Sequence, residues 1–124
     1  MDISTIKPDT IDVPIIHPGT GLPIGLIIKA VSLQDERVAA VRRRLQNKAL
    51  RARNKTTTAE TIEENGNELL MAAVVGWEWG GDSDWKGKKL EFTSGNLKIV
   101  LTEAPWLAQQ IDTVLADEAA FFQK

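Results

Sequence analysis

The sequence predicts an α+β fold that is mainly helical, with about four helices and an N-terminal β-hairpin. Two observations support this prediction. β-Branched residues flank a segment rich in Pro and Gly within residues 12–31. Farther along the chain, apolar residues recur three and four positions apart in four separate segments. A chain of 124 residues suits one domain, which we expect over residues 12–124 after a flexible N-terminus at residues 1–11.

The predicted hairpin spans residues 12–31. Both of its strands contain β-branched isoleucines, and the segment 17–23 between them, HPGTGLP, has the Pro and Gly content of a turn. Gly25 indicates a β-bulge or a close approach of two backbones. His17 is the single histidine of the chain and has no acidic neighbour in sequence. We therefore expect it to stabilise the turn or to be exposed, rather than to act in catalysis.

Two helices are predicted next, over residues 33–54 and 57–78. Ser32 is the expected N-cap of the first helix. The apolar residues of that helix fall on one stripe, and its other faces are strongly basic. Gly66 lies inside the second helix, where glycine costs about 1 kcal/mol relative to alanine. We expect a kink, a break into two helices, or close packing at this position.

Two shorter helices are predicted toward the C-terminus, over residues 94–104 and 105–122. Thr93 or Ser94 is the expected N-cap of the first. Pro105 would clash with the preceding turn of a continuous helix, so the first helix should end before it. Proline suits the first turn of a helix, so the second helix should begin there.

Residues that carry common catalytic chemistry are scarce. The absence of cysteine excludes thiolate catalysis, Cys-ligated zinc and disulfides, and one histidine is too few for most metal sites. The glycine cluster of the hairpin is interrupted by Pro23, unlike a dinucleotide-binding loop. Residues 82–84 begin like a calcium loop, but Lys86 occupies the third ligand position and Thr93 the position of the bidentate Glu. We expect no enzymatic activity, no catalytic residues, no cofactor and no metal.

The sequence also predicts no membrane insertion. The longest apolar run, residues 69–75, is far too short to cross a bilayer. Residues 1–10, MDISTIKPDT, lack the basic and apolar regions of a signal peptide.

Charge is unevenly distributed along the chain. Residues 1–55 carry a net charge of +5 and residues 56–124 carry −7, which together give the net charge of −2. Such asymmetry is typical of a nucleic-acid or partner surface, of copies that attract one another, or of ordinary solvated helix faces. The basic residues proposed for a self-association or charge face are Arg42, Arg43, Arg44 and Arg51.

Three of the four tryptophans lie within residues 69–92. Trp rings bury large areas, so one or two of them should belong to the core. We expect Trp77 and Trp79 to point to different sides, which would leave at least one ring exposed. An exposed Trp beside a glycine-rich backbone is a candidate binding anchor.

Several motifs carry a family resemblance. Residues 77–92 combine a Trp-containing apolar segment, an Asp-rich turn, Trp85 and the sequence LEF before a helix cap. The turn HPGTGLPIG at residues 17–25 precedes a strand and a charged helix. Residues 103–107, EAPWL, precede a helix and then Phe121-Phe122. In these motifs, the chain from about Val13 to Phe122 resembles the tail assembly chaperones of long-tailed, siphovirus-type bacteriophages.

This resemblance implies a small, mostly helical protein that acts in the host cytoplasm during infection and is absent from the mature virion. Such proteins of phages and prophages bind the tape measure protein, keep it soluble and recruit tail tube subunits around it. They self-associate, and they often occur in a short and a frameshift-extended form. This chain would match the short form.

A chaperone of a long apolar helical partner needs an exposed apolar groove at its surface. The candidate residues for contact with the partner are Trp77, Trp79, Trp85, Trp106 and Phe121. Two alternatives stay open: a nucleic-acid-binding phage accessory protein that uses residues 42–55, and a structural tail component. Nucleic acid is not the partner that we favour, because the chain is acidic overall and contains no recognised nucleic-acid-binding motif.

Overall fold

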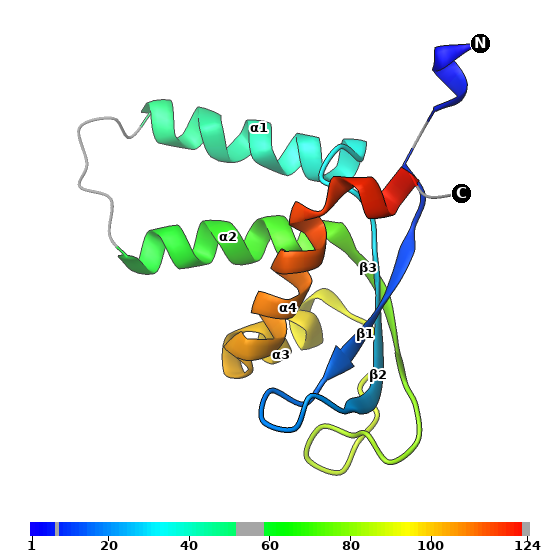
Figure 1. Cartoon of the computed structure of the whole chain (residues 1–124). Coiled ribbons are helices and arrows are strands. Elements are labelled where there is room, and N and C mark those ends of the chain that lie inside the picture. Colours follow the sequence, from blue (N-terminus) through cyan, green and yellow to red (C-terminus); the bar gives the residue numbers. More distant parts are fainter. Residues whose placement is uncertain (7, 52–58, 123–124) are drawn as a thin grey trace.

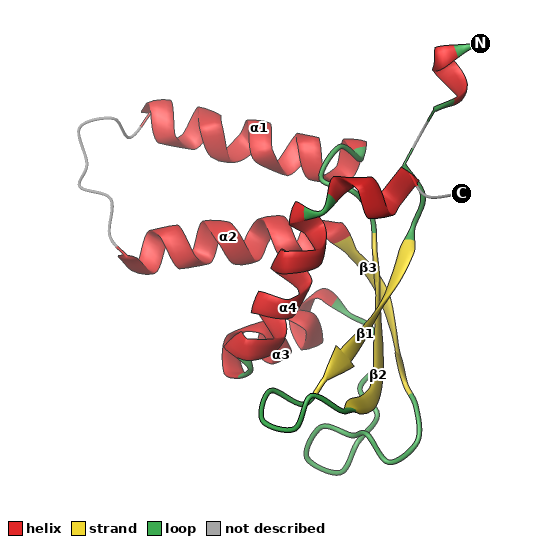
Figure 2. Cartoon of the chain, viewed as in Figure 1, coloured by secondary structure: helices red, strands yellow, loops and turns green. Residues whose placement is uncertain are grey.

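A three-stranded antiparallel sheet lies along one side of the molecule, and helices pack against one of its faces (Figures 1 and 2). The structure is a computed structural model that describes residues 1–6, 8–51 and 59–122, with side chains for all of these except residues 59–64 and 118. The strands β1 (Ile11–Ile16), β2 (Pro23–Ala30) and β3 (Val74–Trp79) lie in the order β1-β2-β3. The predicted α+β class is confirmed.

The predicted N-terminal hairpin is confirmed as β1 and β2, which pair in antiparallel register with Val13 opposite Ile28. His17 stabilises the turn: its Nδ1 accepts hydrogen bonds from the backbone N–H groups of Gly19, at 2.9 Å, and Thr20, at 3.1 Å. Gly25 has a φ of +96°, and a Cβ atom there would clash with the carbonyl oxygen of Gly80. The close backbone approach expected at Gly25 is therefore present.

The next two helices are α1 (Glu36–Arg51) and α2 (Ala59–Ala73). Ser32 is not the N-cap of α1. It is buried at the start of a preceding turn, and Asp35 caps the helix instead by accepting a hydrogen bond from the Arg37 N–H at 2.9 Å. α2 runs unbroken through Gly66, where an added Cβ would meet open space. Neither the break nor the close packing expected at Gly66 occurs.

The helix predicted over 57–78 is wrong at its C-terminal end, because residues 74–79 form strand β3. This strand pairs with β2, with Trp77 opposite Ile28, and a bulge interrupts the register beside Ala30. The sequence VVGWEW is rich in β-branched and aromatic residues, which suit a half-buried strand. The apolar pattern of α2 continues into this segment, so local periodicity alone could not detect the change to a strand.

The last two helices are α3 (Ser94–Glu103) and α4 (Pro105–Ala116). Thr93 is the N-cap of α3, with its side chain accepting from the Asn96 N–H at 3.1 Å, and Pro105 opens α4 as predicted. The helix predicted over 105–122 is too long. The chain leaves the α-helix at Asp117 and continues as a 3₁₀ turn, η2 (Glu118–Phe122). This change of path places the Phe121 ring in the core, where it is 1% exposed.

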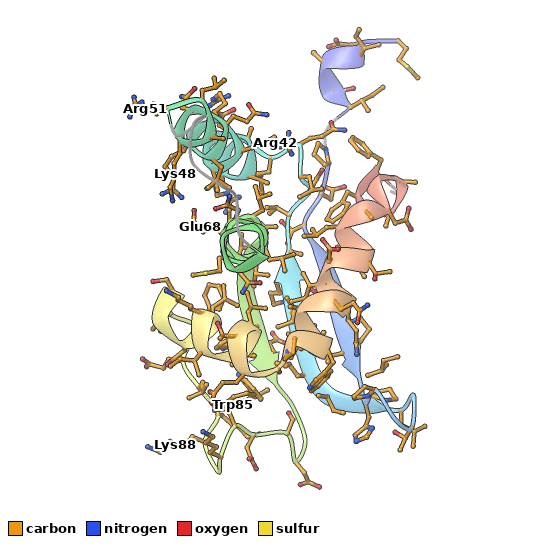
Figure 3. All side chains as sticks on the ribbon, turned by 90° about the vertical axis from the view of Figure 1, so that its left-hand side faces the viewer. Arg42, Lys48, Arg51, Glu68, Trp85 and Lys88 are labelled. Carbon is orange, nitrogen blue, oxygen red and sulfur yellow. The ribbon has the colours of Figure 1, made fainter. Side chains whose placement is uncertain are left out.

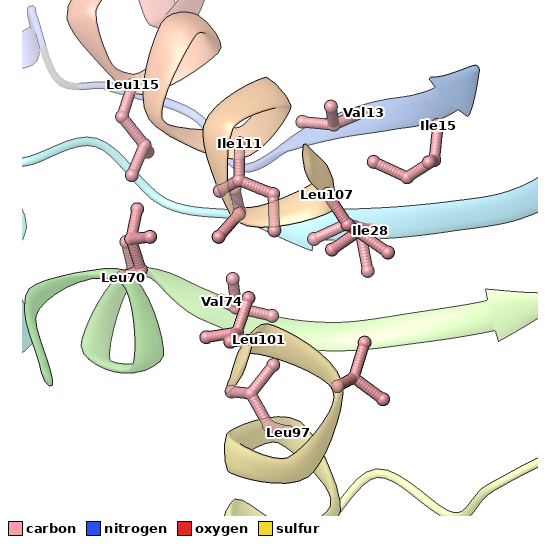
Figure 4. Close-up of a cluster of buried hydrophobic side chains, with 14 of the residues drawn as sticks. Val13, Ile15, Ile28, Leu70, Val74, Leu97, Leu101, Leu107, Ile111 and Leu115 are labelled. Carbon is pink, nitrogen blue, oxygen red and sulfur yellow. The ribbon is translucent and has the colours of Figure 1, made fainter. Parts of the chain in front are cut away.

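The core lies between the inner face of the sheet and α2, α3 and α4 (Figure 4). Alternate residues of the strands supply one side of it and apolar helix stripes supply the other. Figure 4 labels ten of the buried side chains: Val13, Ile15, Ile28, Leu70, Val74, Leu97, Leu101, Leu107, Ile111 and Leu115.

Helix α1 takes little part in this core, since Val38 is its single buried residue. It runs beside α2, and both helices extend away from the sheet (Figure 1). We call residues 36–51 and 59–66 the helical arm. The three strands, residues 67–73, α3, α4 and η2 form the body. Residues 3–5 form a short 3₁₀ turn, η1 (Ile3–Thr5), which Asp2 caps, and the flexible N-terminus stays a prediction.

Candidate partner-binding surfaces

Trp77 and Trp79 lie on the same face of β3. Alternate residues of a strand share a face, so the expectation that these rings point to different sides is wrong. They lie opposite Ile28 and Leu26 of β2, on the face that packs against the helices. The two indoles meet edge to face, with ring centroids 5.6 Å apart. The Phe92 ring meets Trp77 in the same way at 5.2 Å. We call Trp77, Trp79 and Phe92 the aromatic cluster.

Hydrogen bonding fixes one indole of this cluster and leaves the other unpaired. Trp77 Nε1 donates to the carbonyl oxygen of Leu90 at 2.9 Å, which ties the segment before α3 to β3. Trp79 Nε1 is buried and has no acceptor in the described part of the chain. Both rings are half-buried, whereas Phe92 at the outer end of the cluster is 39% exposed. The aromatic cluster therefore extends from the core to the protein surface.

Sequence reasoning did not include Phe92 among the candidate partner-binding residues. Phe92 directly precedes Thr93, the N-cap of α3. An apolar residue at this position often packs against a neighbouring side chain to fix the entry of the chain into a helix. The position of Phe92 before a Thr cap could therefore have identified it as a packing residue. Its contact with Trp77 could not have been identified, because it depends on the placement of β3.

Trp85 belongs to a tight turn rather than to the aromatic cluster. Its backbone pairs with Lys88 across Lys86 and Gly87, which have φ values of +52° and +85°. Positive φ at both central positions is the geometry of a type I′ turn. Asp84 Oδ1 accepts from the Gly87 N–H at 2.9 Å, so this carboxylate has a role in the turn. The calcium-like sequence is thus explained by turn formation.

The loop that leads from β3 to this turn is closed by Lys89. Its Nζ donates to three carbonyl oxygens, those of Trp79 at 3.2 Å, Gly81 at 3.1 Å and Ser83 at 2.9 Å. The ammonium group satisfies backbone acceptors that the loop geometry brings together. Lys89 therefore links three positions of the loop beside the aromatic cluster.

The remaining two candidate aromatic residues lie apart from the cluster. Trp106 is half-buried in the first turn of α4 and packs against the core. Phe121 is buried in η2 and offers no surface to a partner in this conformation. Among the described side chains, no ring contact joins Trp85, Trp106 or Phe121 to the aromatic cluster. Of the aromatic residues predicted to contact a partner, the structure therefore brings Trp77 and Trp79 together.

The predicted basic residues lie on α1, on which Figure 3 labels Arg42 and Arg51. Three of them bind groups of their own chain. Arg42 donates to the carbonyl oxygen of Leu33 at 3.0 Å. Arg43 pairs with Glu36 at 2.7 Å. Arg44 pairs with Glu68 of α2 at 2.9 Å. Some of the basic residues of α1 therefore form ion pairs with acidic residues of the same chain. Arg53 and Lys55 of the predicted basic segment lie outside the described residues.

The described residues contain no group of three or more His, Cys, Asp or Glu side chains arranged to hold a metal ion. Hydrogen bonding lowers the pKa of Asp35, because its carboxylate accepts from the backbone N–H of Arg37. In the described parts of the chain, no helix has both the length and the apolar character needed to cross a membrane.

Comparison of the chain with protein-family models, with curated proteins and with solved structures gave no match. Function must therefore be inferred from the motifs of the sequence and from the surfaces that the structure presents.

Proposed function

We propose that this protein is a tail assembly chaperone of a long-tailed bacteriophage or prophage. It would act without enzymatic chemistry in the host cytoplasm and be absent from the mature virion. Its partners would be the tape measure protein, which it keeps soluble, the tail tube subunits that it helps to recruit, and further copies of itself. The family resemblance of residues 13–122 motivates this proposal.

The observation that carries the proposal is the aromatic cluster. Phe92 is 39% exposed, and its ring is braced from behind by Trp77 at 5.2 Å. Aromatic side chains supply large contact areas with little loss of conformational freedom, and they dominate the binding energy of many interfaces. A ring held in place before binding loses less entropy when a partner docks. The cluster therefore has the properties of an anchor for an apolar side chain.

The surroundings of Phe92 suit reversible binding. The flanking residues Glu91 and Thr93 are exposed and polar, so the apolar surface is small and bordered by hydrated groups. A small apolar site contributes modest affinity for each contact. Many copies along a long partner would then cover its apolar helix faces and could be displaced by tube subunits. The exposed apolar groove expected from the sequence stays a prediction, and the aromatic cluster is the part of it for which we propose a role.

Co-expression tests the proposal directly. The probe is the tape measure protein encoded by the genome that encodes this chain, and the readout is its soluble fraction with and without this protein. We expect the wild type to raise that fraction and Phe92→Glu to lose most of the effect, because a carboxylate would replace the apolar anchor. Leu22→Glu is the matched control, since Leu22 is an apolar residue of the β1–β2 turn that is 66% exposed.

The outcomes separate the competing functions. Equal solubility of the tape measure protein in the presence and absence of the wild type would refute the chaperone. Equal loss of effect in both variants would show that Phe92 is not the anchor. Circular dichroism of each variant checks that the fold is retained. Detection of the protein in purified virions would favour a structural tail component over a chaperone.

A further inference from the structure

Helix α1 concentrates positive charge on the helical arm, whereas the aromatic cluster of the proposed chaperone site belongs to the body. Its sixteen residues include six cations, five of them arginine, and a single carboxylate, Glu36. The planar guanidinium group of arginine matches the geometry of phosphate oxygens and donates two parallel hydrogen bonds. The composition of α1 therefore favours an anionic ligand that carries phosphates.

Four of these cations follow one flank of the helix. Spacings of seven, four and three residues bring them to similar angles around the helix axis. The first and last are about 21 Å apart at a rise of about 1.5 Å per residue. Figure 3 shows Lys48 and Arg51 on the side of α1 opposite to Arg42. We call this set the basic flank: Arg37, Arg44, Lys48 and Arg51.

Ion pairs within the chain hold this charge only weakly. Arg37 and Arg44 pair with Asp35 and Glu68, yet both arginine side chains stay more than 60% exposed. Exposed pairs of this kind contribute about 0–1 kcal/mol, so a phosphate can replace the carboxylate at little cost. Lys48 and Arg51 make no ion pair with any side chain that the structure describes.

The chemistry of the exposed surface favours nucleic acid over an acidic protein. A protein interface normally has an apolar centre, whereas a phosphate backbone is bound through charge and water. Leu50, which is 70% exposed, is the one large apolar residue of α1 that is exposed. The remaining exposed surface is almost entirely arginine, lysine, glutamine, asparagine and alanine.

The acidic character of the whole chain does not oppose this reading of α1. Exposed carboxylates of the body occur in the loop after β3 and on α4, as Asp82 and Asp112. At physiological ionic strength, charges more than about 8 Å apart are largely screened in solvent. Within the arm, α1 carries a net charge of +5 and residues 59–66 carry −3, so the arm as a whole keeps a net charge of +2.

We propose that the basic flank of α1 binds the phosphate backbone of nucleic acid without reading its sequence. Contacts to about three or four phosphates predict that the logarithm of the binding constant falls with the logarithm of salt concentration with a slope of about −3. Binding of this type is weak, with dissociation constants of about 10⁻⁴–10⁻⁶ M at physiological salt. Shuffling the base sequence should leave the affinity unchanged.

Fluorescence anisotropy with a labelled duplex of about 20 base pairs, between about 50 and 200 mM salt, measures the affinity and its slope. The test variant combines Arg44→Gln, Lys48→Gln and Arg51→Gln. We expect at least about a tenfold loss of affinity and a slope nearer to zero, since phosphate contacts are removed. The matched control removes the same charge from the body: Lys86→Gln, Lys88→Gln and Lys98→Gln. We expect it to change the affinity by less than about threefold.

A second variant separates loss of binding from loss of structure. It combines Lys48→Gln with Arg51→Gln and leaves the ion pair between Arg44 and Glu68 intact. A loss of affinity in this variant therefore cannot result from breaking that ion pair. Phe92→Glu should bind the duplex like the wild type, so a failed chaperone assay and a failed duplex assay are distinguishable.

Three results would overturn the proposal. The first is an absence of salt-dependent binding at about 50 mM, where phosphate contacts are strongest. The second is an equal loss of affinity in the test variant and in the matched control, which would show that the basic flank is not the site. The third is equally tight binding of labelled polyglutamate through α1, which would assign this surface to an acidic protein.

Discussion

The body and the helical arm differ in how much of their surface is buried. The body contains Ile15, Ile28 and Ile111 with no measurable exposure, whereas α1 of the arm buries Val38 alone. Local stability follows buried apolar contacts, so the arm should open more readily than the body. The two proposed binding surfaces follow this division. The aromatic cluster is braced by the body, and the basic flank lies on the arm.

This division has a physical reason. An aromatic anchor gains affinity from being fixed, so it benefits from a core behind it. Charged groups act over several ångströms and tolerate small movements, so they do not need a rigid support. Four predictions test whether the body and the arm differ as described.

The largest expected effect is on core packing in the body. Ile111→Ala should lower the free energy of unfolding by about 2–5 kcal/mol, because the side chain is fully buried and its removal leaves a cavity. Leu50→Ala in the arm should change it by less than about 0.5 kcal/mol, because Leu50 is exposed. Urea denaturation of both variants measures the difference. Equal destabilisation would contradict the contrast between the two regions.

Two glycines should respond to alanine with opposite signs. Gly25→Ala should destabilise by more than about 1 kcal/mol, because the position has positive φ and faces the Gly80 carbonyl group. Gly66→Ala should stabilise by about 0.5–1 kcal/mol, because it lies within α2 and an added Cβ meets open space. Thermal unfolding of the pair measures both signs. Destabilisation by Gly66→Ala would show that α2 needs glycine there.

A smaller effect is expected where α4 protects the edge of the sheet. The Gln110 side chain accepts from the Ile16 N–H at 3.0 Å and donates to the Ile16 carbonyl oxygen at 2.8 Å. It thereby occupies the place of a neighbouring strand. Gln110→Ala should cost about 1–2 kcal/mol and increase aggregation detected by light scattering. Gln109→Ala, an exposed neighbour on α4, should change stability by less than about 0.5 kcal/mol, and a similar loss there would argue against edge protection.

The smallest effect concerns the start of the arm. The pKa of Asp35 is lowered in the folded protein by the hydrogen bond from the Arg37 N–H. Its contribution to stability is therefore complete above the unfolded-state pKa of about 4 and is lost as the pH falls through the lower folded-state value. Asp35→Asn keeps a capping group without this titration, so its urea midpoint should fall less than that of the wild type between about pH 5 and pH 3.

The matched control for this titration is Asp112→Asn, which removes an exposed carboxylate of α4. It should retain the acid-dependent loss of stability seen in the wild type. Identical pH dependence in the wild type and Asp35→Asn would show that this cap does not contribute measurably.

Local signals in the sequence were sufficient for several elements. The dense Pro and Gly content of residues 17–23 identified the hairpin turn, and Pro105 identified the boundary between α3 and α4. Thr93 was correctly included among the possible caps of α3. Each of these signals acts through the backbone of a few neighbouring residues, so no distant contact is needed to interpret it.

The candidate surfaces were only partly predictable. The cations of α1 were identified correctly as one basic helix, since their helical spacing is visible in the sequence. The predicted aromatic set lacked Phe92, because its contact with Trp77 forms only after the intervening loop and tight turn fold back onto β3. Phe121 was interpreted as a partner contact, whereas long-range packing buries it.

By itself, the sequence determined the α+β class, the N-terminal hairpin, the start of α4 at Pro105 and the cap of α3 to within the pair Thr93 and Ser94. Tertiary structure alone decided that residues 74–79 form a third strand and that the chain leaves the helix at Asp117. In both places the apolar periodicity of the preceding helix continues and predicts further helix, although the residues of VVGWEW themselves suit a strand. Pairing with β2 and burial of Phe121 outweighed it, because contacts between distant residues contribute more than the small differences in local propensity.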